Sequence, residues 1–269
     1  MAVSTDGWFS NSIYTPGGPF NIYDKHKTPI VAIGTRIRRQ DGNEYVYSHF
    51  GADTNRGVLV STDVSESSRV DSDNIIVAPA SAQTTTDGTI GSKFVEITLA
   101  SVTANQFAGG YFVTTDDTGE GYTYRVKGNT ATDDPASGNF RLELHDPLQV
   151  AVAATTDFAI QGCLYANLEI AVDGTDDCLA GVTVSTMDVS EQAYGWVQVK
   201  GVVGILSDAQ TTAIAIGDTV TLSSEVSGAV MILGEGSTAA VEYAKEEIVG
   251  TCLIAPDDTG HGVYKVQVS

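Results

Sequence analysis

The sequence predicts an all-β protein, and three observations lead to that prediction. Short runs that alternate apolar and polar residues recur along the chain, turns rich in Gly and Asp separate them, and no long stretch has a helical period. The 28 glycines and only three methionines agree with short strands joined by many turns. We therefore expect an extended N-terminal arm followed by two β-sandwich or β-barrel-like regions.

The arm and a hairpin are expected within residues 1–70. Residues 1–30 are rich in Gly, Pro, Asn and aromatic side chains and have no sustained period, so this stretch must be ordered by contacts with something else. Residues 31–62 contain two alternating runs separated by Gln-Asp-Gly-Asn, which predicts a hairpin turn at Asp41-Gly42.

The run RIRR follows the same alternation. In a strand, Arg36 and Arg38 point to one side and Ile37 and Arg39 to the other, which is typical of an exposed strand face. Because the surrounding chain is acidic, contact with a protein partner is favoured over contact with nucleic acid.

The two β-rich regions are expected at residues 71–175 and 176–269. In the first region, strands are predicted at 75–78, 93–100, 110–115, 122–128, 140–145 and 148–153. In the second region, they are predicted at 181–186, 194–206, 213–224, 229–233, 246–255 and 262–269. One helix longer than two turns is predicted, at 237–247.

Two details of the second region can be read from residue parity. In AIAIGDTVTLSS, we expect Ile214, Ile216, Val220 and Leu222 to share one face of half-buried strands interrupted at Gly217-Asp218. Within the 194–206 run, Gly201 and Gly204 predict a bulge or a barrel corner.

The motif DDTG occurs twice, in VTTDDTGEGYTYRVK (113–127) and in IAPDDTGHGVYKVQV (254–268). Each copy lies between strand-like runs, and Asp and Gly are the residues that tight turns require, so a hairpin corner is favoured. Neither copy has the spacing of an EF-hand loop, although an ion site stays an alternative. The acidic stretches 131–138 and 172–177 are interpreted as solvated loops, and a calcium ion bridging subunits remains an open alternative there.

No catalytic, cofactor-binding or metal-binding residue is predicted. The four histidines form no zinc-binding pattern, and the chain lacks a nucleophile elbow, a Walker loop and a dinucleotide fingerprint. We therefore expect a protein that is not an enzyme and needs no cofactor.

The net charge of −20 argues against partners that are nucleic acids or anionic membranes. The charge is unevenly distributed, since residues 1–60 carry six Lys or Arg against five acids and the remainder carries eight against twenty-nine. A near-neutral N-terminal segment can therefore contact an acidic neighbour that the rest of the chain would repel. Three cysteines without a C-x-x-C pair, and the absence of a signal peptide or an apolar run of membrane-spanning length, suggest synthesis in a reducing cytoplasm.

Three stretches together resemble structural proteins of tailed bacteriophages and marine viruses, in particular capsid decoration (cement) proteins. They are GTRIRRQDGNEYVYSHFGAD (34–53), the stretch from TANQFAGGYFVTTDDTGEGYTYRVKG to FRLELHDPLQVAVAATT (103–156), and the stretch from EQAYGWVQVKGVVGIL to the C-terminal GVYKVQV (191–268). The resemblance implies an all-β protein on the capsid surface that bridges neighbouring major capsid subunits, often as a homotrimer.

The expected contact residues combine the aromatic residues of the arm with the arginine run, because aromatic and Arg side chains are the usual anchors of an interface. They are Trp8, Phe9, Tyr14, Phe20, Tyr23, Arg36, Arg38 and Arg39. Two other classes stay open: a tail-fibre or host-adhesion module that binds surface glycans, and a hydrolase or lyase whose acid–base pair is not visible in sequence.

Overall fold

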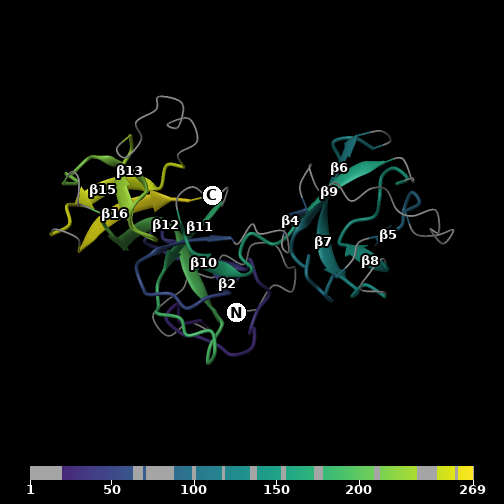
Figure 1. Cartoon of the computed structure of the whole chain (residues 1–269), viewed down its shortest axis with the longest axis horizontal. Coiled ribbons are helices and arrows are strands. Elements are labelled where there is room, and N and C mark those ends of the chain that lie inside the picture. The colour runs from purple at the N-terminus through teal and green to yellow at the C-terminus, as the bar shows by residue number, and fades with distance from the viewer. Residues whose placement is uncertain are drawn as a thin grey trace. The chain divides into compact units, whose positions relative to one another are not determined.

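The computed structural model describes residues 20–62, 69–70, 88–98, 101–116, 119–133, 138–152, 156–172, 178–208, 213–234, 247–257 and 260–268. Within these residues the secondary structure consists of β-strands joined by turns, and no α-helix is present (Figure 1). The prediction of an all-β protein is confirmed.

The chain divides into two compact units. One unit combines Met1–Asp63 with Tyr165–Ser269, and the other is Val64–Leu164. The second unit is therefore inserted into the first along the sequence. This grouping differs from the three consecutive segments expected, because the N-terminal hairpin and the C-terminal region belong to the same unit.

Strand pairing between distant segments explains that grouping. The sheet of the first unit contains β1 (Arg36–Arg38), β2 (Glu44–His49), β3 (Leu59–Thr62), β10 (Leu168–Ile170), β11 (Leu179–Thr183), β12 (Tyr194–Leu206), β13 (Thr219–Leu222), β14 (Val230–Ile232), β15 (Gly250–Ile254) and β16 (His261–Gln267). Its order is β10-β3-β11-β12-β16-β15-β13-β14, with β2 paired to β12 and β1 paired to β2, and its strand pairs are antiparallel. N-terminal strands thus complete a sheet made mostly of C-terminal ones.

The β1–β2 hairpin turns where the sequence predicts. Arg38 is the cross-strand partner of Glu44, and Gly42 has a φ of +87°, a backbone conformation that favours glycine. The Asp41 carboxylate accepts a hydrogen bond from the Asn43 backbone amide at 2.9 Å, which closes the turn.

The long strand β12 organises the first unit. Its residues Tyr194–Lys200 pair with β2, and its residues Lys200–Leu206 pair with β16. The register shifts between Gln198 and Lys200, which places an irregularity beside the predicted Gly201. Gly201 has a φ of +104°, and a Cβ there would lie 1.9 Å from Oδ1 of Asn43, so the hairpin can approach β12 only if this position has no side chain.

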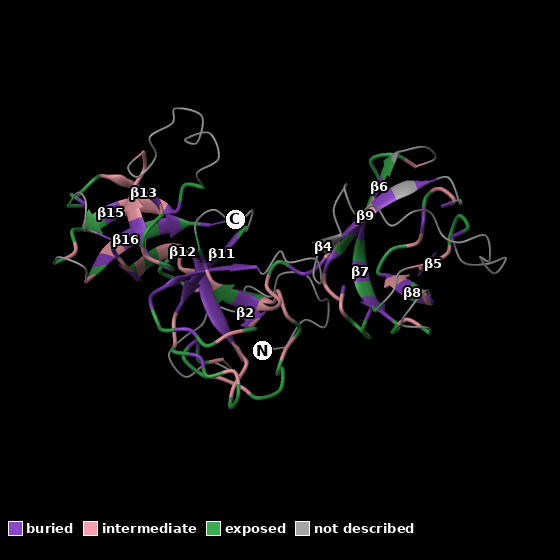
Figure 2. Cartoon of the chain, viewed as in Figure 1, coloured by how far each residue is buried: buried purple, intermediate pink, exposed green. Residues whose placement is uncertain are grey.

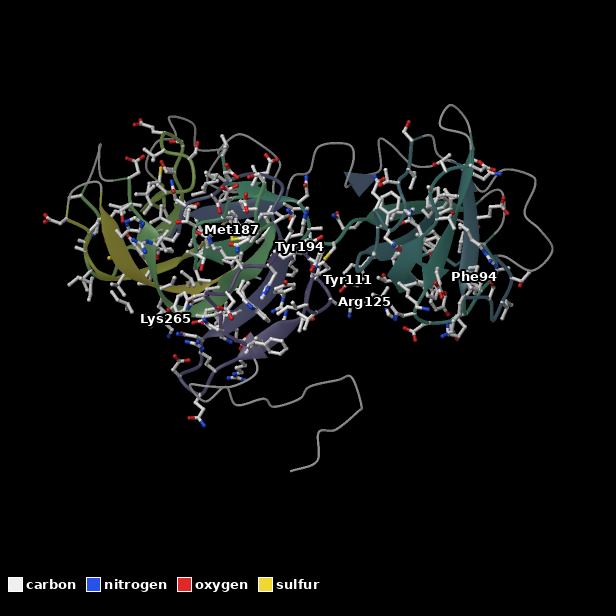
Figure 3. All side chains as sticks on the ribbon, turned by 90° about the horizontal axis from the view of Figure 1, so that it is seen from below. Phe94, Tyr111, Arg125, Met187, Tyr194 and Lys265 are labelled. Atoms are coloured by element: carbon white, nitrogen blue, oxygen red, sulfur yellow. The ribbon has the colours of Figure 1, made fainter. Side chains whose placement is uncertain are left out.

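The second unit is built on a six-stranded antiparallel sheet. Its strands are β4 (Arg69–Val70), β5 (Phe94–Thr98), β6 (Tyr111–Asp116), β7 (Thr123–Asn129), β8 (Asn139–Leu144) and β9 (Asp157–Gln161), in the order β4-β9-β6-β7-β8-β5. The first DDTG motif joins β6 to β7, where Tyr111 lies opposite Arg125 (Figure 3), and the second joins β15 to β16. Both copies therefore connect antiparallel neighbours, as the hairpin prediction requires.

Each unit has a hydrophobic core of its own. In the second unit, buried residues alternate with exposed ones along β7 (Figure 2), and the core includes the fully buried Phe107, Phe112, Phe140 and Phe158. In the first unit, separate clusters of buried side chains surround Tyr264, Phe50 and Trp196. Burial of apolar area in two separate places favours two units that are stable by themselves.

The strand predicted at 148–153 is wrong over its described residues, and the one predicted at 213–224 is confirmed only as β13 (Thr219–Leu222). Leu148 and Val152 are buried, but their amides donate to the carbonyls of Ser92 and Gly88 in a loop, so two apolar residues of the same parity are buried there without a strand. Residues 213–216 also form no strand. Ile214 is buried, whereas Ile216 is 72% exposed because it lies in the turn that Asp218 closes on Ala215.

Two further predictions lie outside the described residues. They are the strand at 75–78 and, except for its last residue, the helix at 237–247.

Candidate interaction surface

The aromatic residue Phe20 ties the beginning of the described chain to the first unit. Its ring lies 6.0 Å from that of Trp196, which in turn meets the ring of Tyr47 edge-on at 5.1 Å. Trp196 is 2% exposed, and the neighbouring Ile22 is equally buried. Phe20 therefore packs against its own unit with its side chain half-buried, and its contact with an external partner stays a prediction.

Backbone bonds continue this attachment. His26 and Tyr194 exchange both of their amide-to-carbonyl hydrogen bonds, at 2.8 and 3.0 Å. Tyr23, between these two anchor points, keeps 61% of its surface exposed, which leaves it accessible as a contact residue. The predicted contact residues Trp8, Phe9 and Tyr14 lie outside the described residues.

Arg36 and Arg38 share the exposed face of β1, whereas Ile37 between them is buried, so the predicted alternation is confirmed. One guanidinium nitrogen of Arg36 donates to the hydroxyl of Tyr165 at 2.8 Å. Arg38 lies 3.6 Å from Glu44, and 71% of its side chain is exposed. An exposed ion pair of this kind contributes little stability, which leaves Arg38 accessible to a partner.

Arg39 diverges from the other two arginines and lines a cavity. Its guanidinium lies over the ring of Tyr45, 5.2 Å from the ring centre. The cavity has a volume of about 500 Å³ and lies between the β1–β2 hairpin, the turn at Arg56-Gly57, β11 and the second half of β12. Arg56 and His261 also line it, and none of its described lining residues is an acid.

The aromatic wall of this cavity stays uncharged at neutral pH. Burial raises the pKa of the Tyr45 hydroxyl, and the positive charge of Arg39 offsets part of that rise. Tyr45 therefore offers an aromatic surface and a neutral hydroxyl, and the formal charge of the wall comes from the two guanidinium groups.

Sequence reasoning missed Arg56, His261 and Asn43 as members of this site. Arg56 and His261 belong to different segments that meet only through the pairing of β12 with β16, and His261 packs against Gly57, where a Cβ would lie 2.8 Å from its ring. No local sequence motif indicates that these two segments lie side by side. Gly57 has a φ of +71°, but the sequence does not distinguish it from the other glycines expected in turns.

His49 gives the first unit a dependence on pH. Burial lowers the pKa of its imidazole, whose Nδ1 accepts a hydrogen bond from the backbone amide of Asn167 at 3.3 Å. The folded state therefore prefers the neutral ring. The stabilisation is fully present above the ordinary histidine pKa of 6.5 and is lost as the pH falls through the lowered pKa of the folded state.

We expect the unfolding free energy of the first unit to decrease as the pH falls from about 7.5 to 5, with a smaller decrease in His49→Gln. Denaturant unfolding at several pH values measures this. His261→Gln removes an exposed imidazole and is the matched control for the substitution of a histidine. An identical slope in wild type and His49→Gln would contradict the assignment.

The described residues contain no group of three or more His, Cys, Asp or Glu side chains that could hold a metal ion. The second Asp and the Thr of each DDTG turn lie outside the described residues. Nor do the described parts of the chain include a helix long and apolar enough to cross a membrane.

Comparison with known proteins adds no family to these observations. No protein-family model, no curated protein and no solved structure matches the chain significantly.

Proposed function

We propose that the protein is a non-enzymatic structural protein of a virion, which decorates and stabilises a tailed-phage capsid by bridging neighbouring major capsid subunits. The proposal combines the resemblance of the sequence to capsid decoration proteins with the all-β architecture of the chain. Its location would be the outer surface of the capsid, after synthesis in the host cytoplasm.

One observation carries the proposal furthest: exposed cations occupy an accessible edge of a strongly acidic chain. β1 pairs with β2 on one side only among the described strands, and it presents Arg36 and Arg38 outward. The whole chain has a net charge of −20. Because an acidic chain is repelled by acidic neighbours, a local cationic edge gives it one favourable orientation toward them.

Self-association, as a homotrimer, is the second part of the proposal. The sheet of the second unit ends in β4 and β5, whose outer edges pair with no other described strand. Exposed strand edges are surfaces that symmetric assembly can cover. Sedimentation of the purified chain measures the stoichiometry directly, and a monomer at all concentrations would exclude a trimer formed in solution.

The arginine edge is expected to contribute to capsid binding. In the Arg36→Gln/Arg38→Gln variant, affinity for capsids that lack the protein should fall by about ten-fold or more, and the remaining binding should depend less on salt. Co-sedimentation with capsids over a series of salt concentrations measures both effects.

A matched control removes the same charge elsewhere. Lys93 and Lys127 are exposed on the second unit and bond the His145 carbonyl and the Glu143 carboxylate, so Lys93→Gln/Lys127→Gln tests net charge alone. Equal losses of capsid affinity in both double variants would exclude a specific role of the β1 edge. Absence of capsid binding by the wild type, together with binding to a glycan array, would replace the proposal with the host-adhesion alternative.

A further inference from the structure

We propose that the second unit binds an acidic polysaccharide on the outer face of its sheet, at a row formed by Tyr111, Arg125 and His145. The outer face is the one opposite the core, and its described side chains are exposed or half-buried. This binding would be a further function of the second unit, and it does not depend on the proposed role at the capsid.

The row crosses three neighbouring strands. Tyr111 on β6 is the cross-strand partner of Arg125 on β7 (Figure 3), and the amide of His145, directly after β8, donates to the Arg125 carbonyl at 2.9 Å. The next residue pair is hydrogen-bonded, from the Val126 amide to the Gly110 carbonyl, so Tyr111 and Arg125 form a non-hydrogen-bonded pair, in which side chains stand closest. Because strands lie about 4.8 Å apart, the row is about 10 Å long.

The side chains of this row are available to a ligand. Tyr111 keeps 43% of its surface exposed, and Arg125 and His145 are exposed as well. Within the described parts of the chain, no hydrogen bond, ion pair or ring contact engages the phenol, the guanidinium or the imidazole of these three residues. An external group can therefore reach the Arg125 charge without displacing a described partner.

The charge of the row selects an anion. Residues 64–164 carry five Lys or Arg against thirteen acids, so cations are scarce in this unit. Lys93 bonds the His145 carbonyl at 2.7 Å and adds a second cation at that end of the row. Glu143, on the same face, is paired with Lys127 at 2.6 Å, which leaves Arg125 for an external acid. Its planar guanidinium matches a carboxylate with two parallel hydrogen bonds.

The aromatic ring and its polar surroundings favour a sugar over a protein partner. Tyr111 is the only large apolar side chain that is exposed among the described residues of this face, whereas protein interfaces bury a larger apolar core. The apolar C–H face of a sugar ring can pack on the Tyr111 ring. Gln161, opposite Tyr111 on β9, and the exposed Thr123 on β7 offer an amide and a hydroxyl to sugar hydroxyls. A polysaccharide with carboxylates on its rings meets these requirements together.

The test uses the full chain and a fluorescent oligogalacturonate, with its methyl ester as the neutral counterpart. Fluorescence anisotropy at about 0.1 M salt, where the Debye length is about 10 Å, should show binding of the acidic form and about ten-fold weaker binding of the ester. Arg125→Gln should weaken binding by about ten-fold or more. Lys265→Gln removes the same charge from an exposed position of β16 in the first unit and should change affinity by less than about two-fold.

Two variants of Tyr111 distinguish a sugar from other anions. Tyr111→Ser should weaken binding of the oligogalacturonate by about five-fold, whereas Tyr111→Phe keeps the ring and should bind like wild type. An unchanged affinity in Tyr111→Ser would overturn the sugar assignment, and tighter binding of a Glu-rich peptide would replace the sugar with a protein partner. Absence of oligogalacturonate binding, or equal losses in Arg125→Gln and Lys265→Gln, would overturn the site.

Folding and capsid binding are separate readouts. Because Tyr111 and Arg125 are exposed, thermal unfolding of Tyr111→Ser and Arg125→Gln should match wild type, so lost binding cannot be attributed to misfolding. Co-sedimentation of Arg125→Gln with capsids should also be unchanged. Lost capsid binding in this variant would instead make the outer face part of the capsid contact, and absence of capsid binding by the wild type would leave the polysaccharide site standing.

Discussion

Replacement of Trp196 by alanine is expected to destabilise the first unit by about 3–5 kcal/mol, the range for truncating a large buried aromatic residue. The indole is 2% exposed and contacts rings from two other parts of the chain, Phe20 and Tyr47. Its removal leaves a cavity where the N-terminal segment, β2 and β12 meet. The expected result is therefore both a lower unfolding free energy and a loosened N-terminal segment.

Trp196→Phe separates the loss of packing from the loss of polar contacts. The indole Nε1 is buried without a hydrogen-bond partner among the described residues, so phenylalanine removes no bond and even relieves an unsatisfied donor. We expect Trp196→Phe to cost about 1–2 kcal/mol, clearly less than the alanine variant. Urea unfolding followed by circular dichroism measures both values.

Limited proteolysis supplies the second readout. If Trp196 holds the segment that contains Phe20, the alanine variant should be cut between that segment and β1 under conditions in which wild type is resistant. Truncation of Leu253, an apolar side chain that is 39% exposed, is a control that should change neither readout. A loss below about 1 kcal/mol in Trp196→Ala would contradict the anchoring role.

Features decided by neighbouring residues were predictable from the sequence. The Asp41-Gly42 turn and the DDTG corners follow from turn chemistry that acts within a few residues, and the 194–206 strand was predicted with the bounds of β12. The alternation of Arg36, Ile37 and Arg38 was equally visible, because side chains in a strand point to opposite faces by geometry alone.

Features decided by distant residues were not predictable. The pairing of β2 with β12 brings together parts of the chain that the sequence assigns to different segments, and alternation does not specify a partner strand. The cavity could not be predicted for the same reason, since Arg56 and His261 become neighbours only after β12 and β16 pair. Ile216 shows a third limit. The regular alternation of the sequence places its side chain on the same face as Ile214, but the turn that contains it exposes the side chain.

The second large effect concerns the unit that is inserted into the other. We expect each unit to fold without the other. β3 and β10 flank the insertion and are themselves paired, with Thr62 opposite Leu168. Opposite residues of antiparallel strands lie roughly 5 Å apart, so a short loop can close the gap that removal of the second unit leaves.

A chain in which residues 64–164 are replaced by Gly-Ser-Gly should retain the fold of the first unit, with an unfolding midpoint within about 5 °C of the corresponding transition in the full chain. The residues Tyr165 and Asn167 stay in this variant because they bond Arg36 and His49. Calorimetry of the full chain should show two transitions, one of which disappears in the shortened chain.

The excised fragment 64–164 should show the calorimetric unfolding transition that the shortened chain lacks. The described core of buried aromatic and aliphatic side chains is drawn from its own strands and loops, so excision keeps that core together. Phe112→Ala in the fragment is expected to cost about 3–5 kcal/mol, and the same substitution in the full chain should leave the transition of the first unit unchanged. A fragment without cooperative unfolding, or a shortened chain that fails to fold, would mean that the two units stabilise each other and that the insertion is part of one cooperative structure.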